Sequence, residues 1–271
     1  MGKKSIITQM PITAQTPPSP ADPAARWRVE DFNELIYSQG YDAFIDRALR
    51  CPCVDKSTGQ ALSTCKNCLG RGWFFVNRRE TRLIAQSMDN KKRYENWSEV
   101  NRGMAKITTR AVDKLGFMDR VILMELEAYY SEILRPTMFE GELIAYPVYE
   151  PLEVTEIYLF TSDDQKLFPI PAEMYSISGN KIVFDPTLEE YIEANTTDAV
   201  QMSVTIRYSY HPVYHIVDAN RELMKVREGN CCFRDDQLTA MPNYALARKA
   251  HYIFDAQKYG AILYDNSVEE L

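Results

Sequence analysis

Four of the six cysteines of this chain lie within eighteen consecutive positions, in the stretch "RCPCVDKSTGQALSTCKNCLGRGWFF" (residues 50–75). Cys51 and Cys53 form one close pair, Cys65 and Cys68 form a second, and eleven residues separate the pairs. Structural zinc sites are commonly built from two such pairs, which the fold brings together into a closed tetrahedron of thiolates. The spacing therefore predicts a zinc site with these four cysteines as ligands. The alternative, four unrelated free thiols, leaves the paired spacing unexplained.

A site with four cysteine ligands leaves no coordination position for water or substrate, so we expect this zinc to be structural and not catalytic. Its binding free energy would fold a polar segment that has too few apolar residues to fold alone. Gly70 and Gly72 follow the last ligand, where backbone amides commonly turn toward thiolate sulfur. We expect Trp73, Phe74 and Phe75 to dock this zinc knuckle onto the main core.

The composition predicts a folded protein that is made in the cytosol. The chain has 271 residues, 45% hydrophobic and 25% charged, which is close to average globular usage and fits one large domain or two smaller ones. No run approaches eighteen apolar residues, and the first twenty residues lack the apolar core of a signal peptide, so we expect no membrane partner. In a reducing cytosol, clustered cysteines are more often metal ligands than disulfides.

The charge of the chain is unevenly distributed. The net charge is −7, which argues against a general nucleic-acid binder. The segment Arg71–Arg110 nevertheless carries ten basic and four acidic residues, leaving −13 for the remainder. Such polarity suggests one basic face that meets an acidic partner or DNA, although a solvated surface is the alternative. The candidate contacts in this segment are Arg78, Arg79, Arg82, Lys91, Lys92 and Arg93.

The pattern of apolar residues predicts a helix followed by many short strands. Apolar residues recur at helical spacing from Val29, and Gly40 ends the helix. The next stretch, residues 41–50, fits either a helix or a strand. The runs "MAKITTRAV", "DRVILMEL", "LEVTEIYLF", "MYSISGNKIVF" and "VQMSVTIRYSY" are rich in β-branched and aromatic residues. Gly179 and Asn180 suggest a tight hairpin turn, and residues 241–260 have a helical composition.

We therefore expect a mainly β, α+β fold. It would comprise an antiparallel β-barrel or sandwich domain with an N-terminal helix, a zinc-knuckle insertion and a C-terminal helical extension. The expected segments are an extended proline-rich arm (1–26), a helical segment with the four-cysteine knuckle (27–80), a β domain (81–216) and a C-terminal extension (217–271).

The remaining candidate residues do not assemble a catalytic site. His211 and His215 are four residues apart beside a strand-like run, where they would lie about 13 Å apart, too far to share a metal. They are interpreted as core or turn residues. Cys231 and Cys232 are adjacent and can hardly chelate one ion together, so they are interpreted as small buried or loop residues. No GxSxG, HExxH, GxGxxG or phosphate-binding glycine loop is present, and we expect a protein that is not an enzyme.

The order of these pieces resembles a family of structural proteins from the neck of tailed bacteriophages. The likeness covers roughly residues 27–250 and includes the cysteine stretch, "KLGFMDRVILME", "EMYSISGNKIVF", "VTIRYSYHPVYHIVDANRE" and "LTAMPNYALARK". The resemblance implies a β domain that packs in a closed ring below the portal, closing the head or joining it to the tail. It also implies that Cys51, Cys53, Cys65 and Cys68 hold structural zinc.

The partners implied by this resemblance are other copies of the chain in a ring of six or twelve, a portal or adaptor ring above and tail or tail-terminator proteins below. Genomic DNA would pass through the channel without sequence-specific binding, and assembly into the virion neck would take place in the host bacterial cytoplasm. The proline-rich arm could lie across a neighbouring copy. A second interpretation is a nucleic-acid-binding module, in which the zinc knuckle and the basic segment bind phosphates. An enzyme is the third.

Overall fold

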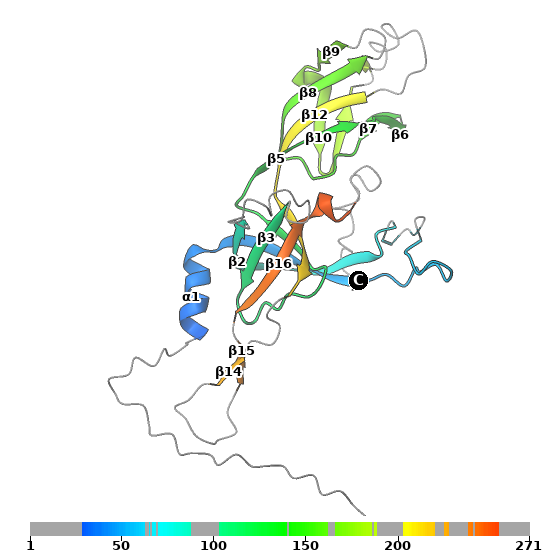
Figure 1. The fold of residues 1–271 in the computed structure, drawn as a ribbon. Coiled ribbons are helices and arrows are strands. Elements are labelled where there is room, and N and C mark those ends of the chain that lie inside the picture. The colour runs from blue at the N-terminus through cyan, green and yellow to red at the C-terminus, as the bar shows by residue number, and fades with distance from the viewer. Residues whose placement is uncertain are drawn as a thin grey trace, which may run out of the picture.

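The structure, a computed structural model, is mainly β, with antiparallel sheets and a helix, α1 (Val29–Gln39), near the N-terminus (Figure 1). This confirms the predicted fold class. The structure describes residues 29–62, 65, 67–68, 70–87, 103–139, 141–161, 166–185, 187–188, 203–219, 225–227, 238–240 and 242–254. The predicted proline-rich arm and the adjacent cysteines Cys231 and Cys232 lie outside these residues.

Six antiparallel strands close into a ring of strands in the order β1–β2–β3–β16–β13–β4. We call this body the ring. Its strands are β1 (Tyr41–Arg50), β2 (Trp73–Ser87), β3 (Met104–Thr109), β4 (Arg120–Leu123), β13 (Val213–Asp218) and β16 (Asn243–Lys249). The short strand β4 pairs with β1 on one side and β13 on the other, which closes the circle.

The ring is not a clean barrel, because its ladders are interrupted. The register shifts between Ile45 and Arg47 on β1 and between Ile216 and Asp218 on β13. Such bulges bend a strand and increase its twist, which helps a small sheet to close. Inside, a core of mostly aliphatic residues includes Ile45, Leu83, Ile107, Val121 and Ala247.

Two further sheets form a second body, the lobe, which is inserted between β4 and β13 and lies above the ring in Figure 1. One sheet has the order β5–β12–β8–β9, and the other has the order β10–β11–β7–β6. The strands of the first sheet are β5 (Ala128–Leu134), β12 (Ser203–Tyr210), β8 (Glu153–Thr161) and β9 (Lys166–Pro169). Those of the second are β10 (Tyr175–Ser178), β11 (Lys181–Phe184), β7 (Glu142–Ala145) and β6 (Thr137–Phe139).

The lobe and the ring are joined by a continuous apolar core. The same cluster contains Ile206 and Tyr208 of the lobe strand β12 and Phe75, Ile122 and Val213 of the ring strands. Smaller elements lie at the edges: a 3₁₀ turn, η3 (Ala172–Met174), a second 3₁₀ turn, η4 (Ala250–Tyr252), and a two-stranded sheet of β14 (Lys225–Arg227) and β15 (Leu238–Ala240).

The structure agrees with the sequence predictions for the end of α1 and for one hairpin turn. The amide of Gly40 donates to the carbonyl of Ile36 over 2.8 Å as the helix ends, and a side chain at Gly40 would meet the Ile36 carbonyl oxygen. Strands β10 and β11 pair across the predicted turn, where Gly179 has a φ of 58°. That conformation favours glycine, so both predictions are confirmed.

The predicted C-terminal helix is wrong over residues 243–249, which form β16. This strand lies between β3 and β13, so it belongs to the ring and not to a helical extension. Ala245 and Ala247 point inward and are buried, while Tyr244, Leu246 and Arg248 are only partly buried. Pairing on both sides overrides the helical preference of Ala, Leu, Arg and Lys. The open choice for residues 41–50 is resolved as strand β1.

Among the described residues, no helix has the length and apolar character needed to cross a membrane.

Candidate metal centre

The four clustered cysteines lie on the connection between the neighbouring strands β1 and β2, a segment that we call the cysteine loop (residues 51–72). Arg50 pairs with Trp73 at the mouth of the loop, and the Cys51 amide donates to the Gly72 carbonyl over 2.8 Å. The two ends of the loop are therefore fixed by the ring. Connections of this length without secondary structure of their own are uncommon between paired strands.

The loop folds back on itself before it reaches the second cysteine pair. Val54 and Ala61 form an isolated antiparallel bridge. Between them, the carboxylate of Asp55 accepts a hydrogen bond from the Ser57 amide over 2.7 Å, as polar residues do in tight turns. The Leu62 amide then donates to the Cys53 carbonyl over 2.9 Å. This fold-back returns the chain to the first cysteine pair.

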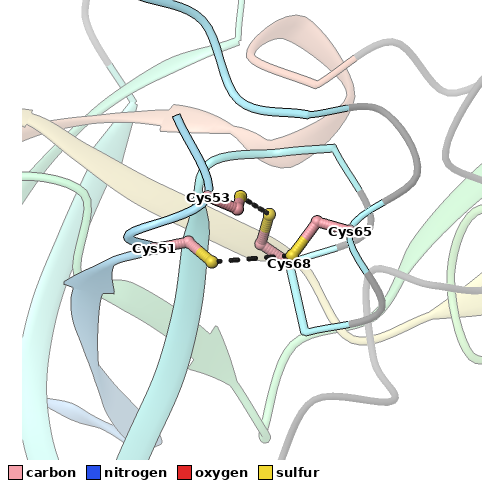
Figure 2. Close-up of side chains that lie close together, drawn as sticks. All are labelled: Cys51, Cys53, Cys65 and Cys68. Atoms are coloured by element: carbon pink, nitrogen blue, oxygen red, sulfur yellow. Dashed lines mark hydrogen bonds between the residues drawn. The ribbon is translucent and has the colours of Figure 1, made fainter. Parts of the chain in front are cut away.

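The four sulfur atoms converge. Cys51 Sγ lies 3.8 Å from Cys65 Sγ, Cys53 Sγ lies 3.2 Å from Cys68 Sγ, and all four sulfurs lie within 4.8 Å of one another. Figure 2 shows the side chains of the two pairs pointing toward a common centre. Tetrahedral coordination with metal–sulfur bonds of about 2.3 Å places sulfurs roughly 3.8 Å apart. The cysteines are therefore close enough to hold a metal ion, and none of them forms a disulfide.

The backbone of the second pair favours a thiolate at Cys65. A backbone hydrogen bond from Cys68 is the main cause that lowers the pKa of Cys65 to about 6, with a hydrogen bond to the Cys53 side chain and the backbone of Asn67 contributing further. A hydrogen bond to the charged form of a group stabilises that form. The backbones of Asn67 and Cys68 therefore prepare a ligand that is charged near neutral pH.

The thiols of Cys51 and Cys53 lose their protons less readily than the thiol of Cys65. Burial raises the pKa of Cys51, and a hydrogen bond with the Cys68 side chain raises the pKa of Cys53 to about 12. A bound cation reverses this order because it favours the thiolate form of every ligand. Metal binding at this site therefore releases protons and weakens at low pH.

The end of the cysteine loop is tied to the ring by backbone geometry and by one arginine. Gly70 and Gly72 have φ values of 84° and 77°, which favour glycine and let the chain turn sharply after Cys68. Arg71 is buried, its amide donates to the Cys68 carbonyl over 2.9 Å, and its guanidinium lies 5.9 Å from the ring centre of Phe254. This arginine links the second cysteine pair to the segment that follows β16.

The predicted aromatic anchor is present in part. Phe75 is buried in the core that joins ring and lobe, and Trp73 packs against the same core. Trp73 also makes an edge contact with Phe117, with ring centres 5.8 Å apart. The cysteine loop is therefore attached to the packed interior through the first residues of β2. Phe74, the third predicted anchor, is only partly buried.

The basic residues of β2 that were predicted to contact a partner form ion pairs within the chain. Arg78 pairs with Asp46 over 3.0 Å and Arg82 pairs with Asp42 over 2.6 Å. Arg79 lies 3.9 Å from Asp113. Each of these charges faces an acidic group of the ring. Their role as contacts for DNA or an acidic partner stays a prediction, and Lys91, Lys92 and Arg93 lie outside the described residues.

A buried charged pair beside the core that joins ring and lobe was not predicted from the sequence. Arg120 and Asp46 are each at most 2% exposed. Arg120 Nε donates to Asp46 Oδ2 over 2.7 Å, and Nη2 lies 2.6 Å from the same oxygen in an ion pair. The guanidinium lies 4.5 Å from the centre of the Phe75 ring. The register of β1 with β4 pairs Asp46 with Arg120 and brings them into contact.

The histidines occupy core and turn positions, as predicted. His215 is buried on β13, with Nδ1 3.2 Å from the Met118 carbonyl oxygen. Burial lowers its pKa to about 3, so the imidazole is neutral. His211 lies between β12 and β13, with Nδ1 3.2 Å from the Leu126 carbonyl oxygen. Both rings are held by backbone carbonyls.

Comparison with protein-family models and with curated proteins finds no match to this chain.

Proposed function

We propose that the protein is a virion structural protein of the neck of a tailed bacteriophage. Copies would form a ring of six or twelve between the portal and the tail, closing the head or joining head to tail around the DNA channel. The proposal draws on the resemblance of the sequence motifs and on the surface of the folded chain. In this account, other copies, a portal or adaptor ring and tail proteins are the partners, and assembly takes place in the host cytoplasm.

The observation that supports this proposal most is the set of large apolar side chains that both bodies expose. Six such side chains are more than half exposed in the described part of the chain: Tyr37, Val112, Phe117, Tyr129, Ile133 and Leu167. The first three belong to the ring or to α1, and the others belong to the lobe. Exposure on both bodies suits a subunit that contacts neighbours along its length.

Contacts on different faces also suit a closed ring. Cyclic rings with more than two subunits use head-to-tail contacts between unlike surfaces. Ring and lobe provide unlike surfaces on one subunit, and a shared apolar cluster joins them. The internal ion pairs of Arg78, Arg79 and Arg82 favour this proposal over the nucleic-acid-binding module, which needs those charges for phosphates.

We propose zinc as the metal of the cysteine site, and a structural role for it. Four thiolates in a tetrahedral arrangement suit zinc, and they leave no position open for catalysis. The cysteine loop has few apolar residues, so the ion would supply the free energy that folds it. Elemental analysis of the purified protein should find one zinc per chain. A stoichiometry near zero after purification without chelators contradicts the zinc proposal.

The neck role is tested by removing the protein from the phage that encodes it. Infection with a phage whose gene carries an early stop codon should yield filled or leaking heads and separate tails, with infectivity restored by the gene supplied in trans. Electron microscopy and plaque counts measure both. Normal yields of joined, infectious particles without the protein contradict the proposal.

A further inference from the structure

Strand β5 is an open edge of the lobe. It is the first strand in the sheet order β5–β12–β8–β9 and pairs with β12 through seven registered positions, from Ala128 to Leu134. In the part of the chain that the structure describes, no strand pairs with its other side. Such an edge presents unpaired backbone N–H and C=O groups and is a template for another strand. Natural proteins commonly protect such edges with charge, proline or a covering segment.

The open edge of β5 borders a groove that is mostly lined by β5 and β7. The groove has a volume of about 720 Å³. Leu134 and Ile144 form buried parts of its lining, while Ile133 and Tyr146 are exposed to 68% and 44%. The lining also includes the polar residues Ser131, Glu132 and Arg135, so the groove is partly apolar, and it adjoins the backbone edge of β5. That combination is what strand addition requires, because main-chain hydrogen bonds provide affinity and side-chain pockets provide specificity.

The chain itself contains a segment with the matching pattern. In "KSIITQMPIT" (residues 4–13), Ile6, Thr8, Met10 and Ile12 alternate with the residues between them, and alternation places them on one face of an extended strand. This segment lies outside the described residues. Pro11 is compatible with an added edge strand.

The arm is long enough to reach another subunit. Residues 14–28, between this segment and α1, include Pro17, Pro18, Pro20 and Pro23. Proline-rich linkers favour extended conformations of about 3.1 Å per residue and act as semi-rigid spacers, so this linker spans roughly 45 Å. In Figure 1, α1 lies beside the ring, while the β5 sheet lies in the lobe above it. A spacer of this length that starts at α1 would allow the segment to reach a neighbouring subunit.

We propose that residues 4–13 of one copy add as a strand to the β5 edge of a neighbouring copy and place Ile6, Met10 and Ile12 in the groove beside Ile133 and Ile144. This inference rests on the proposed function, since it supplies the contact between adjacent subunits of the ring. It also explains why a subunit would keep an open edge beside a partly apolar groove: the neighbour covers both.

A peptide experiment tests the docking without requiring a ring. A fluorescein-labelled peptide of residues 3–14 is titrated into the full-length chain carrying Ile6→Asp and Met10→Asp, so that the protein's own arm does not compete. Fluorescence anisotropy should show saturable binding. Adding Ile133→Asp should weaken it at least about tenfold, since a charge would replace an apolar contact at the centre of the interface. The matched control, Leu167→Asp, lies on β9 at the opposite edge of the same sheet and should leave binding unchanged.

Absence of saturable binding, or equal loss in the two aspartate variants, overturns the inference. Circular dichroism of both variants checks that the lobe remains folded, and Ile133 and Leu167 are each more than half exposed. The identity of the acceptor subunit is tested with a photo-reactive residue in place of Gln9, using mixed ¹⁴N- and ¹⁵N-labelled protein. Cross-links to residues 128–146 should join light and heavy chains, and cross-links only within one chain contradict docking on a neighbour. A ring that assembles without this cross-link refutes the arm contact alone and leaves the neck proposal standing.

Discussion

Two aspartates of β1 show how burial determines the contribution of an ion pair to stability. Asp46 and Asp42 each bond an arginine of β2, Arg78 and Arg82. Asp46 is 2% exposed and also binds the buried Arg120, whereas the side chain of Asp42 is 55% exposed. Solvent screens the pair of Asp42 and Arg82 far more than the pair of Asp46 and Arg120, in which both groups are buried. The same two residue types therefore make contributions of different size to the stability of the ring.

Asp46→Asn should lower the free energy of unfolding by about 3–5 kcal/mol, because it leaves the guanidinium of Arg120 buried without its counter-charge. Asp42→Asn, on the same strand, is the matched control and should leave stability nearly unchanged. Urea denaturation followed by tryptophan fluorescence measures both. Equal urea midpoints for the two variants would show that the buried ion pair contributes no more to stability than the exposed one.

Replacement of Cys65 by Ser should remove the metal and unfold the cysteine loop while the ring and the lobe remain largely intact. Cys65 contributes the thiolate whose pKa is lowered, and three thiolates no longer close the site. Elemental analysis and limited proteolysis around residues 51–72 measure the two effects. Cys231→Ser, which also removes one thiol, should change neither. Unchanged metal content in the Cys65 variant would remove this residue from the site.

At the scale of elements, local signals were sufficient where the local chain determines the outcome. Local patterns predicted the helix before Gly40, the turn at Gly179 and the many short strands. Helix stop signals and β-branched runs act over only a few residues. The cysteine cluster was predictable for the same reason, since its spacing lies within one loop. Strand β16 was not: its alanines favour a helix in isolation, and only pairing with β3 and β13 makes it a strand.

Positions inside the ring should tolerate a larger side chain less well than positions on its partly exposed face. Ala247 is fully buried and pairs with Ala105 on one side and Ile216 on the other. Ala247→Leu should cost about 1–3 kcal/mol, because the narrow interior cannot accept the added methyl groups without strain. Lys106→Leu, on the partly exposed face of β3, should change stability by less than about 0.5 kcal/mol. Thermal denaturation measures both, and a tolerated Ala247→Leu would place this side chain outside the ring interior.

At the scale of the whole molecule, a polar contact supplements the apolar joint between the ring and the lobe. His251, in η4 directly after the ring strand β16, has its Nδ1 hydrogen-bonded to the hydroxyl of Tyr149. Tyr149 stacks on Tyr210 of the lobe with ring centres 4.0 Å apart. Burial, reinforced by the neighbouring charges of Lys249 and Arg248, lowers the pKa of His251 to about 4. The joint therefore contains an imidazole that is neutral in the folded protein.

This histidine makes stability depend on pH in a defined direction. Between about pH 6.5 and 4, the unfolded chain binds a proton at His251 that the folded chain does not, so stability falls as the pH falls through this window. His251→Gln should show a shallower decrease of the urea midpoint over the same range. Both proteins keep the four cysteines, so the difference between the profiles excludes thiolate protonation. Parallel profiles would show that His251 titrates alike in both states.

The arrangement of the strands in the whole molecule was the feature least predictable from the sequence. The ring combines strands from residues 41 to 249, and the lobe is inserted between two of its strands. The buried pair of Asp46 and Arg120 exists only because β1 and β4 meet across that long separation in sequence. Such contacts depend on closure of the ring, which no local pattern encodes. The surface exposed by both bodies is likewise a property of the assembled fold.

The most direct test of the neck proposal is the copy number of the protein in purified virions of the phage that encodes it. Quantitative mass spectrometry with labelled standard peptides would compare it with the portal subunit in the same particles. The account predicts about six or twelve copies per particle, as a closed ring on the tail axis requires. Absence from the particle would contradict the account and favour the nucleic-acid-binding module in its place.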